Sequence, residues 1–253
     1  MSIPKIIHKI WIQGYNQIPN KLKNFHLHCK IINNDYEFIV WDETSIKKLL
    51  EKFGEKYIKL YDSHTIFAQK ADIARYAILY IYGGIYLDMD MICRKNLSSL
   101  LNFQVFLTTG YPSFLNFMIN RYYNGIIGAI PNHPVFQFVF KNIFERQNSK
   151  DKVLYSTGPI LLYDSVIEYI KTTGKNDITV IDRKYIHPCS PYDDDLCPFT
   201  CDSCYVAHTN DGSWYSSFVK NFYKYAKFKN IYILMFLIIL LIMLINIYKL
   251  GSN

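Results

Sequence analysis

The chain has 253 residues, which is enough for one globular domain with a substantial hydrophobic core. Half of the residues are hydrophobic and 17% are aromatic, and this composition excludes an intrinsically disordered chain. The net charge of +7 is modest, and the sequence has no Lys/Arg-rich stripe with interleaved aromatic residues, so nucleic acid is not the expected partner.

The first part of the chain predicts two strand–helix units. Residues 3–11, IPKIIHKIW, predict an apolar strand suited to the middle of a parallel sheet. A helix is expected over residues 22–32, and a second strand over residues 36–41. Residues 43–53 place their apolar side chains on one face of a second helix. Strands and helices in this alternation predict a parallel α/β sheet.

Residues 70–90, KADIARYAILYIYGGIYLDMD, combine three signals. Residues 70–82 are almost continuously apolar and lack Pro, which predicts a buried helix. Gly83 and Gly84 end this helix, because glycine adopts the left-handed conformation at little cost. Residues 85–87 are β-branched, aromatic and aliphatic, so they predict a short buried strand that runs directly into Asp88-Met89-Asp90.

Four charged side chains of this stretch are candidates for a site. Asp88 and Asp90 face the same way in an extended chain, and a divalent cation such as Mn²⁺ or Mg²⁺ would relieve their repulsion. Asp72 and Arg75 share one face of the preceding helix. A lone Asp-x-Asp usually marks a loop, and an Asp/Arg pair at this spacing is usually a surface ion pair. The two pairs together, around a buried helix and strand, favour a functional site.

The second half of the chain continues the α/β pattern. Strands are predicted over residues 104–109 and 124–130, the latter rich in small residues. A helix over residues 134–146 begins with a Pro, and so does a helix over residues 159–170. A late strand is expected over residues 178–181.

The cysteines leave the cellular compartment open. Cys29 and Cys93 are isolated in the sequence and are expected as small buried hydrophobic residues. The other four crowd into one loop: Cys189, Cys197, Cys201 and Cys204. Two disulfides would suit an oxidising compartment and a structural zinc would suit the cytosol, but the spacing matches no known zinc signature. Disulfides or plain thiols are therefore favoured over zinc.

An uncharged run near the C-terminus predicts a membrane anchor. Residues 231–248 would form a helix of about 27 Å, close to the lower limit for crossing a bilayer. A buried core helix is the alternative, but lysines crowd the preceding segment. The lysines lie mainly before the run, so the positive-inside rule places the large domain in the cytosol.

Residues 70–101 resemble the DxD-containing sugar transferases of the glycosyltransferase family 32 type, which include yeast α-1,6-mannosyltransferases and inositol-phosphorylceramide mannosyltransferases. The segment CRKNL at residues 93–97 is most similar to the latter branch. The resemblance implies a GT-A-like, nucleotide-sugar-binding Rossmann-type sheet over residues 1–217. A basic juxtamembrane segment, 218–230, and a transmembrane helix, 231–248, would follow.

The resemblance also implies a metal site for the donor diphosphate. Asp88 and Asp90 would hold Mn²⁺ or Mg²⁺ on the diphosphate of a nucleotide sugar. His208, which precedes a Ser-Trp element, would be the third protein ligand. Ser213 and Trp214 would close over the diphosphate.

Contacts to the rest of the donor follow from the same resemblance. Asp72 and Arg75 would contact the sugar. The first strand of the family begins IPKIIHQIW and leads to the base pocket, so Trp11 is expected to stack on the nucleotide base. Trp11 as a core residue is an equally plausible reading of the sequence alone.

The expected function is that of a retaining, metal-dependent glycosyltransferase. Mannose from GDP-mannose is the favoured donor over a UDP-sugar, and the expected acceptor is a lipid such as inositol phosphorylceramide or a glycan. The alternative is a catalytically inactive, membrane-anchored protein that binds a sugar nucleotide or a glycan. A single-pass C-terminal anchor in the Golgi or another endomembrane is expected. Cellular relatives act in the Golgi lumen, in conflict with the orientation predicted from the lysines.

Overall fold

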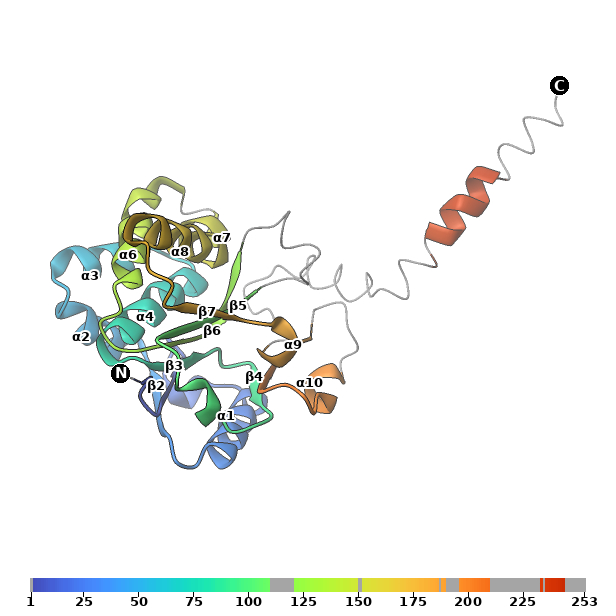
Figure 1. The fold of residues 1–253 in the computed structure, drawn as a ribbon, viewed down its shortest axis with the longest axis horizontal. Coiled ribbons are helices and arrows are strands. Elements are labelled where there is room, and N and C mark those ends of the chain that lie inside the picture. Colours follow the sequence, from blue (N-terminus) through green and yellow to red (C-terminus); the bar gives the residue numbers. More distant parts are fainter. Residues whose placement is uncertain are drawn as a thin grey trace, which may run out of the picture.

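The computed structural model of the protein describes residues 2–109, 121–149, 152–186, 188–189, 196–209, 233 and 235–243. Its centre is a six-stranded sheet in the order β2-β1-β3-β6-β5-β7 (Figure 1). The strands are β1 (Ile6–Ile10), β2 (Glu37–Trp41), β3 (Gly84–Leu87), β5 (Val105–Thr109), β6 (Tyr122–Ala129) and β7 (Ile178–Ile181). Every strand predicted from the sequence is therefore present, with small shifts at the ends.

The sheet is mixed, so the prediction of a parallel sheet is wrong at one strand. β1 runs parallel to β2 and to β3, and β5 runs parallel to β7. β6 lies between β3 and β5 and runs antiparallel to both. A strand covered on both faces is apolar whichever way it runs, so the composition of β6 did not reveal its direction.

A second, two-stranded sheet lies beside the large one. β4 (Met91–Cys93) directly follows the Asp-Met-Asp segment and pairs antiparallel with β8 (Val206–His208). In this register Met91 is opposite His208. The pairing places residues 206–208 beside residues 91–93, which directly follow the Asp-Met-Asp segment.

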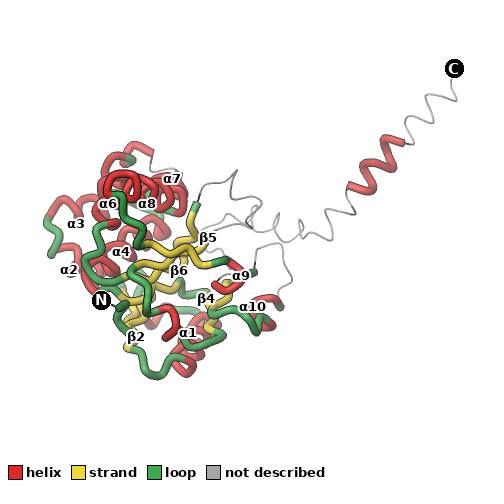
Figure 2. The backbone as a smooth tube through the Cα atoms, in the orientation of Figure 1, coloured by secondary structure: helices red, strands yellow, loops and turns green. Residues whose placement is uncertain are grey.

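Helices cover both faces of the large sheet (Figure 2). The longer ones are α1 (Asn20–Ile32), α2 (Glu43–Glu51), α3 (Glu55–Asp62), α4 (Phe67–Tyr82), α6 (Val135–Glu145) and α8 (Pro159–Thr173). Single turns of helix are α7 (Val153–Ser156), α9 (Arg183–Ile186) and α10 (Cys197–Thr200), with 3₁₀ turns at Tyr15–Gln17, Ser98–Leu100 and Gln147–Ser149. The helix α3 was not predicted. Asp42 caps α2 by accepting a 2.8 Å hydrogen bond from the backbone amide of Ser45.

Two hydrophobic cores lie on opposite faces of the sheet. The larger core joins α2, α3, α4, α6 and α8 to one face, with Tyr76 and Tyr86 among its fully enclosed side chains. The smaller core joins α1, β4 and β8 to the other face, around Ile7 and Leu87. The sheet is thus the middle layer of three, and the site lies where its β3 strand ends.

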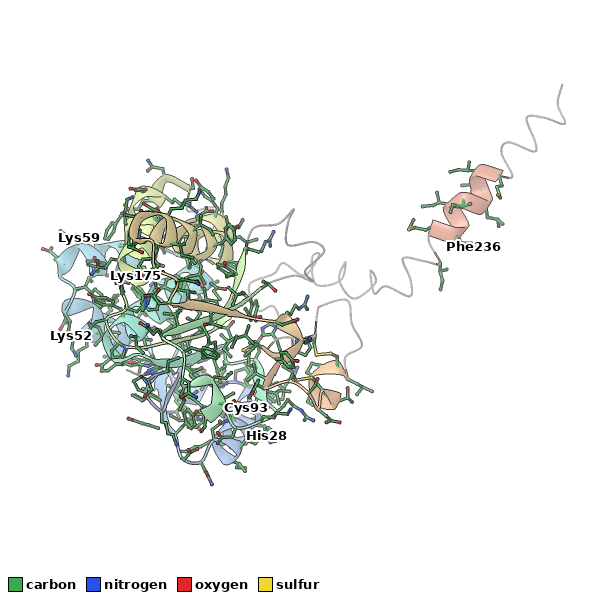
Figure 3. The ribbon with its side chains drawn as sticks, in the orientation of Figure 1. His28, Lys52, Lys59, Cys93, Lys175 and Phe236 are labelled. Carbon is green, nitrogen blue, oxygen red and sulfur yellow. A yellow bond between two sulfur atoms is a disulfide. The ribbon has the colours of Figure 1, made fainter. Side chains whose placement is uncertain are left out.

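All six cysteines are paired, which corrects one prediction. Cys29 of α1 and Cys93 of β4 form a disulfide across a sequence separation of 64 residues, so they are not isolated (Figure 3 labels Cys93). Sequence spacing could not show this pair, because the fold alone brings α1 against β4. Cys189 pairs with Cys197 and Cys201 with Cys204, which agrees with the disulfide reading of the loop and not with zinc.

Among the described residues, no helix is both long enough and apolar enough to cross a bilayer. Only Ile233 and residues 235–243 of the predicted span 231–248 are described, and they are helical. The predicted segment 218–230 lies outside the described residues.

Candidate active site

The approach of α4 to β3 depends on two glycines. α4 ends at Gly83, whose φ of 64° is unfavourable for residues with a side chain, and Gly84 has a φ of 88°. A Cβ on Gly84 would lie 2.7 Å from the carbonyl oxygen of Ile6 in β1. The chain therefore passes from the helix directly into a central strand. This confirms the helix and strand predicted here, and it places Asp88 at the end of β3.

Asp88, Asp90 and His208 converge on one point. One ligand atom from each side chain lies within 4.8 Å of the other two. Nε2 of His208 is 3.0 Å from Oδ1 of Asp90, and the backbone amide of Thr209 donates a 3.1 Å hydrogen bond to the Asp90 carbonyl. Burial opposes ionisation of Asp90, but the charge and hydrogen bond of His208, a backbone hydrogen bond and the charge of Lys9 together lower the pKa of Asp90. The pairing of β4 with β8 creates this cluster.

The cluster has the donor set of a divalent cation site. Two carboxylates suit a hard cation such as Mg²⁺ or Mn²⁺, and the imidazole is a ligand that first-row transition ions accept readily. Each of the three side chains is partly exposed. The residues present fit such an ion, and their role as ligands remains a prediction.

Arg75 lies between Asp72 and Asp88 and contacts both carboxylates. Its guanidinium is buried, with Nη2 3.0 Å from Oδ1 of Asp72 and Nη1 3.4 Å from Oδ1 of Asp88. Nη1 also donates a 2.5 Å hydrogen bond to the backbone carbonyl of Asn124 in β6. The ring centroid of Tyr86 lies 4.5 Å from the guanidinium carbon. These contacts fix the orientation of the guanidinium beside the cluster.

Asp72 is enclosed by its own partners. Thr157 donates a 2.8 Å hydrogen bond to Oδ2 and Asn124 a 2.9 Å hydrogen bond to Oδ1, beside the ion pair with Arg75. Burial raises the pKa of Asp72 to about 6, although Arg75 and Thr157 oppose that shift. The predicted contact of Asp72 with the sugar remains a prediction, whereas its contact with Arg75 is direct.

Three residues of the site were not singled out from the sequence. The hydroxyl of Tyr86 donates a 2.7 Å hydrogen bond to Oδ1 of Asp88, and the ring of Tyr123 lies 5.6 Å from that of His208. Nζ of Lys9 donates a 3.2 Å hydrogen bond to the Asp88 carbonyl. Burial lowers the pKa of Lys9 to about 8, against the attraction of Asp90 and Asp88. The alternation of a strand places Tyr86 on the side of Asp88, and a Lys inside an apolar strand is unusual, so both signals were present.

The remaining predicted residues lie at the margin of this cluster or outside the described residues. Trp11 is partly buried against a small core that includes Leu22 and Met89. Its Nε1 atom is buried and has no hydrogen-bond partner among the described residues. Both the base-stacking role and the core role of Trp11 are compatible with this position. Ser213 and Trp214 lie outside the described residues.

The chain matches a family profile and several curated proteins. The family profile "Glycosyltransferase sugar-binding region containing DXD motif" matches residues 19–107. The chain is 52% identical over 213 residues to "Uncharacterized glycosyltransferase L373" of Acanthamoeba polyphaga mimivirus, covering 84% of each chain. It is 33% identical over 165 residues to "Inositol phosphoceramide mannosyltransferase 3" of Schizosaccharomyces pombe, covering 64% of this chain and 44% of that protein.

A solved structure shares the fold. The "PaToxG Glycosyltransferase" structure superimposes with a TM-score of 0.51 at 24% sequence identity, covering 67% of this chain and 70% of that one. The chain thus spans most of the viral relative but less than half of the fungal one. Substrates printed in the fungal name therefore describe that protein alone.

Proposed function

The chain belongs to the glycosyltransferases with a DXD motif in their sugar-binding region, and we propose that it transfers mannose from GDP-mannose to a lipid such as inositol phosphorylceramide or to a glycan. The donor and acceptor are suggested by the fungal relatives, which are named inositol phosphoceramide mannosyltransferases or mannosyl phosphorylinositol ceramide synthases. A UDP-sugar is the competing donor. The observation that carries the proposal is the convergence of Asp88, Asp90 and His208 beside the buried Arg75.

The residues of the site have distinct tasks in this proposal. Asp88, Asp90 and His208 would hold a Mn²⁺ or Mg²⁺ ion, which when bound neutralises charge on the diphosphate leaving group. Arg75 would orient oxygens of the donor, and Asp72, ion-paired with Arg75, would bind hydroxyls of the sugar. Trp11 would stack on the base, and Ser213 and Trp214 would cover the diphosphate. Retention of anomeric configuration is expected.

We also propose attachment to an endomembrane through residues 231–248, preceded by the basic segment 218–230. Three disulfides in one domain favour an oxidising compartment such as the Golgi lumen. The distribution of lysines points to the cytosol instead. Protease treatment of sealed vesicles distinguishes the two orientations, since a lumenal domain is protected until detergent is added.

The donor is tested with the purified full chain and Mn²⁺. GDP-mannose, GDP-fucose, UDP-glucose and UDP-galactose are compared for release of the free nucleotide and for transfer to inositol phosphorylceramide in detergent. We expect turnover of GDP-mannose that Asp88→Asn and Asp90→Asn each abolish. Turnover of a UDP-sugar alone would refute the donor assignment. Hydrolysis of GDP-mannose without transfer to the lipid would refute inositol phosphorylceramide as the acceptor.

A further inference from the structure

Lys9 is a fully buried cation close to Asp88 and Asp90. It is the last residue but one of β1, and its side chain has no exposed surface. Successive residues of a strand point to opposite faces, so Lys9 shares the face of Ile7, which packs against α1. Its neighbour His8 points the other way, where Nε2 is 3.0 Å from the Gly83 carbonyl. A buried ammonium group is costly unless other charges compensate it.

The compensating charges belong to the Asp-Met-Asp segment. Nζ of Lys9 donates its hydrogen bond to the backbone carbonyl of Asp88, at 3.2 Å. The acids whose charge acts on this ammonium group are Asp90 and Asp88. Among the described residues, Lys9 forms no ion pair with a carboxylate within 4.0 Å, so it binds the turn through the backbone and leaves the carboxylate oxygens to other partners.

Two cations therefore act on Asp88, and of the two only Lys9 also acts on Asp90. Arg75 contacts Asp88 from α4, while Lys9 lies on the face of the sheet that α1 covers. When a divalent ion binds Asp88 and Asp90, Lys9 has no route to solvent and its charge stays close to that ion. Like charges at this range repel one another in a medium less polar than water.

We propose that Lys9 is a positioning residue, an internal counter-ion that holds Asp88 and Asp90 together before the divalent ion binds and weakens the binding of that ion. This rests on the metal site of the proposed function. The consequence is a site that is already formed in the metal-free protein and that exchanges its metal readily.

The first test measures coupling without any metal. Thermal unfolding of the full chain in a chelator is compared for the unmodified protein, Lys9→Gln, Asp90→Asn and the double variant. Gln keeps an N–H donor on a side chain one bond shorter and has no charge. We expect Lys9→Gln to lower Tm, and to lower it by less than half as much in the Asp90→Asn background.

Several outcomes of this cycle are decisive. Equal losses of Tm in the two backgrounds would show that Lys9 acts by packing alone, which overturns the proposal. If Lys9→Gln alone does not fold but the double variant with Asp90→Asn does, the two residues are coupled even more strongly, which supports the proposal. Lys9→Gln unfolded in both backgrounds contradicts the proposal.

The second test titrates Mn²⁺ by calorimetry in the absence of nucleotide. We expect Lys9→Gln to bind Mn²⁺ about 5- to 10-fold more tightly than the unmodified protein, because one cation has been removed from the site. Lys59→Gln is the matched control, since Lys59 lies on α3 at the edge of the molecule with its side chain 73% exposed (Figure 3). Unchanged or weaker binding by Lys9→Gln would overturn the proposed effect on the metal. If the unmodified protein and both variants bind no Mn²⁺, the proposed metal site fails and the metal-free cycle alone decides the role of Lys9.

Discussion

Gly125 of β6 lies against the carboxylate of Asp88. A Cβ atom at Gly125 would be 2.5 Å from Oδ2 of Asp88, and the amide of Asp88 donates a 2.8 Å hydrogen bond to the Gly125 carbonyl. We expect Gly125→Ala to displace this carboxylate and lower kcat/KM by about 100-fold, because misplacement of a binding group by about 1 Å costs that much. Steady-state kinetics with GDP-mannose measure the loss.

Gly174→Ala is the control for Gly125→Ala. Gly174 ends α8 with a φ of 68°, and a Cβ there would meet no atom within 4 Å. The change should lower the free energy of unfolding by about 1 kcal/mol and leave kcat/KM unchanged. Equal kcat/KM for Gly125→Ala and Gly174→Ala would show that the close contact of β6 with Asp88 does not affect catalysis.

His208 should determine the affinity for the metal. Its imidazole is the one nitrogen donor in the cluster with Asp88 and Asp90, so His208→Ala removes one of three protein ligands. We expect the Kd for Mn²⁺ to rise by at least about 10-fold, measured by calorimetry. His28→Ala, at an exposed position on α1, should leave the Kd unchanged (Figure 3). Undiminished Mn²⁺ affinity in His208→Ala would exclude the histidine as a ligand.

The disulfide between Cys29 and Cys93 should contribute strongly to stability. It closes a loop with a sequence separation of 64 residues, whereas Cys201 and Cys204 are separated by 3. On the chain-entropy estimate, replacing the first pair by Ser lowers the free energy of unfolding by about 4 kcal/mol and replacing the second by less than about 2 kcal/mol. Denaturant unfolding of the two double variants measures both losses. A smaller loss for the Cys29/Cys93 variant would contradict the expectation.

His8 should make the protein less stable in acid. Burial lowers the pKa of His8 to about 4, with the Gly83 carbonyl opposing that shift, and Trp41 donates a 3.2 Å hydrogen bond to Nδ1. Below pH 6.5 the unfolded chain takes up a proton at His8 that the folded protein does not, so stability falls as the pH drops from 6.5 toward 4. Between pH 7 and pH 5 this amounts to about 2 kcal/mol.

Urea unfolding at pH 7 and pH 5 measures the effect of His8, with His8→Asn as the comparison. The variant should lose less stability than the unmodified protein over this interval. NMR titration of the imidazole gives an independent reading, and a pKa near 6.5 would contradict the burial of a neutral ring.

The sequence predicted the fold where local signals and burial agree. α4, the glycine pair and β3 were identified because one continuous apolar stretch, two glycines and a β-branched strand leave few alternatives. The direction of β6 and the Cys29–Cys93 pair were not identified. Both depend on which elements become neighbours in space, and neither leaves a trace in local composition.

The candidate site was predicted in part for the same reason. Asp88 and Asp90 adjoin each other in the chain, so their spacing was informative, whereas His208 entered only through the family resemblance. Lys9 was passed over because it lies in a strand in which apolar residues dominate, far in sequence from Asp88. A charged residue inside such a strand is the signal that was available.

The register of β4 with β8 has a consequence for biosynthesis. Met91 can face His208 only after β8, which follows every other described strand, has left the ribosome. A nascent chain thus possesses both acids long before it possesses the imidazole, and a truncated product would carry an incomplete set. Enzymatic competence would then arrive late in translation, after the large sheet has had time to form.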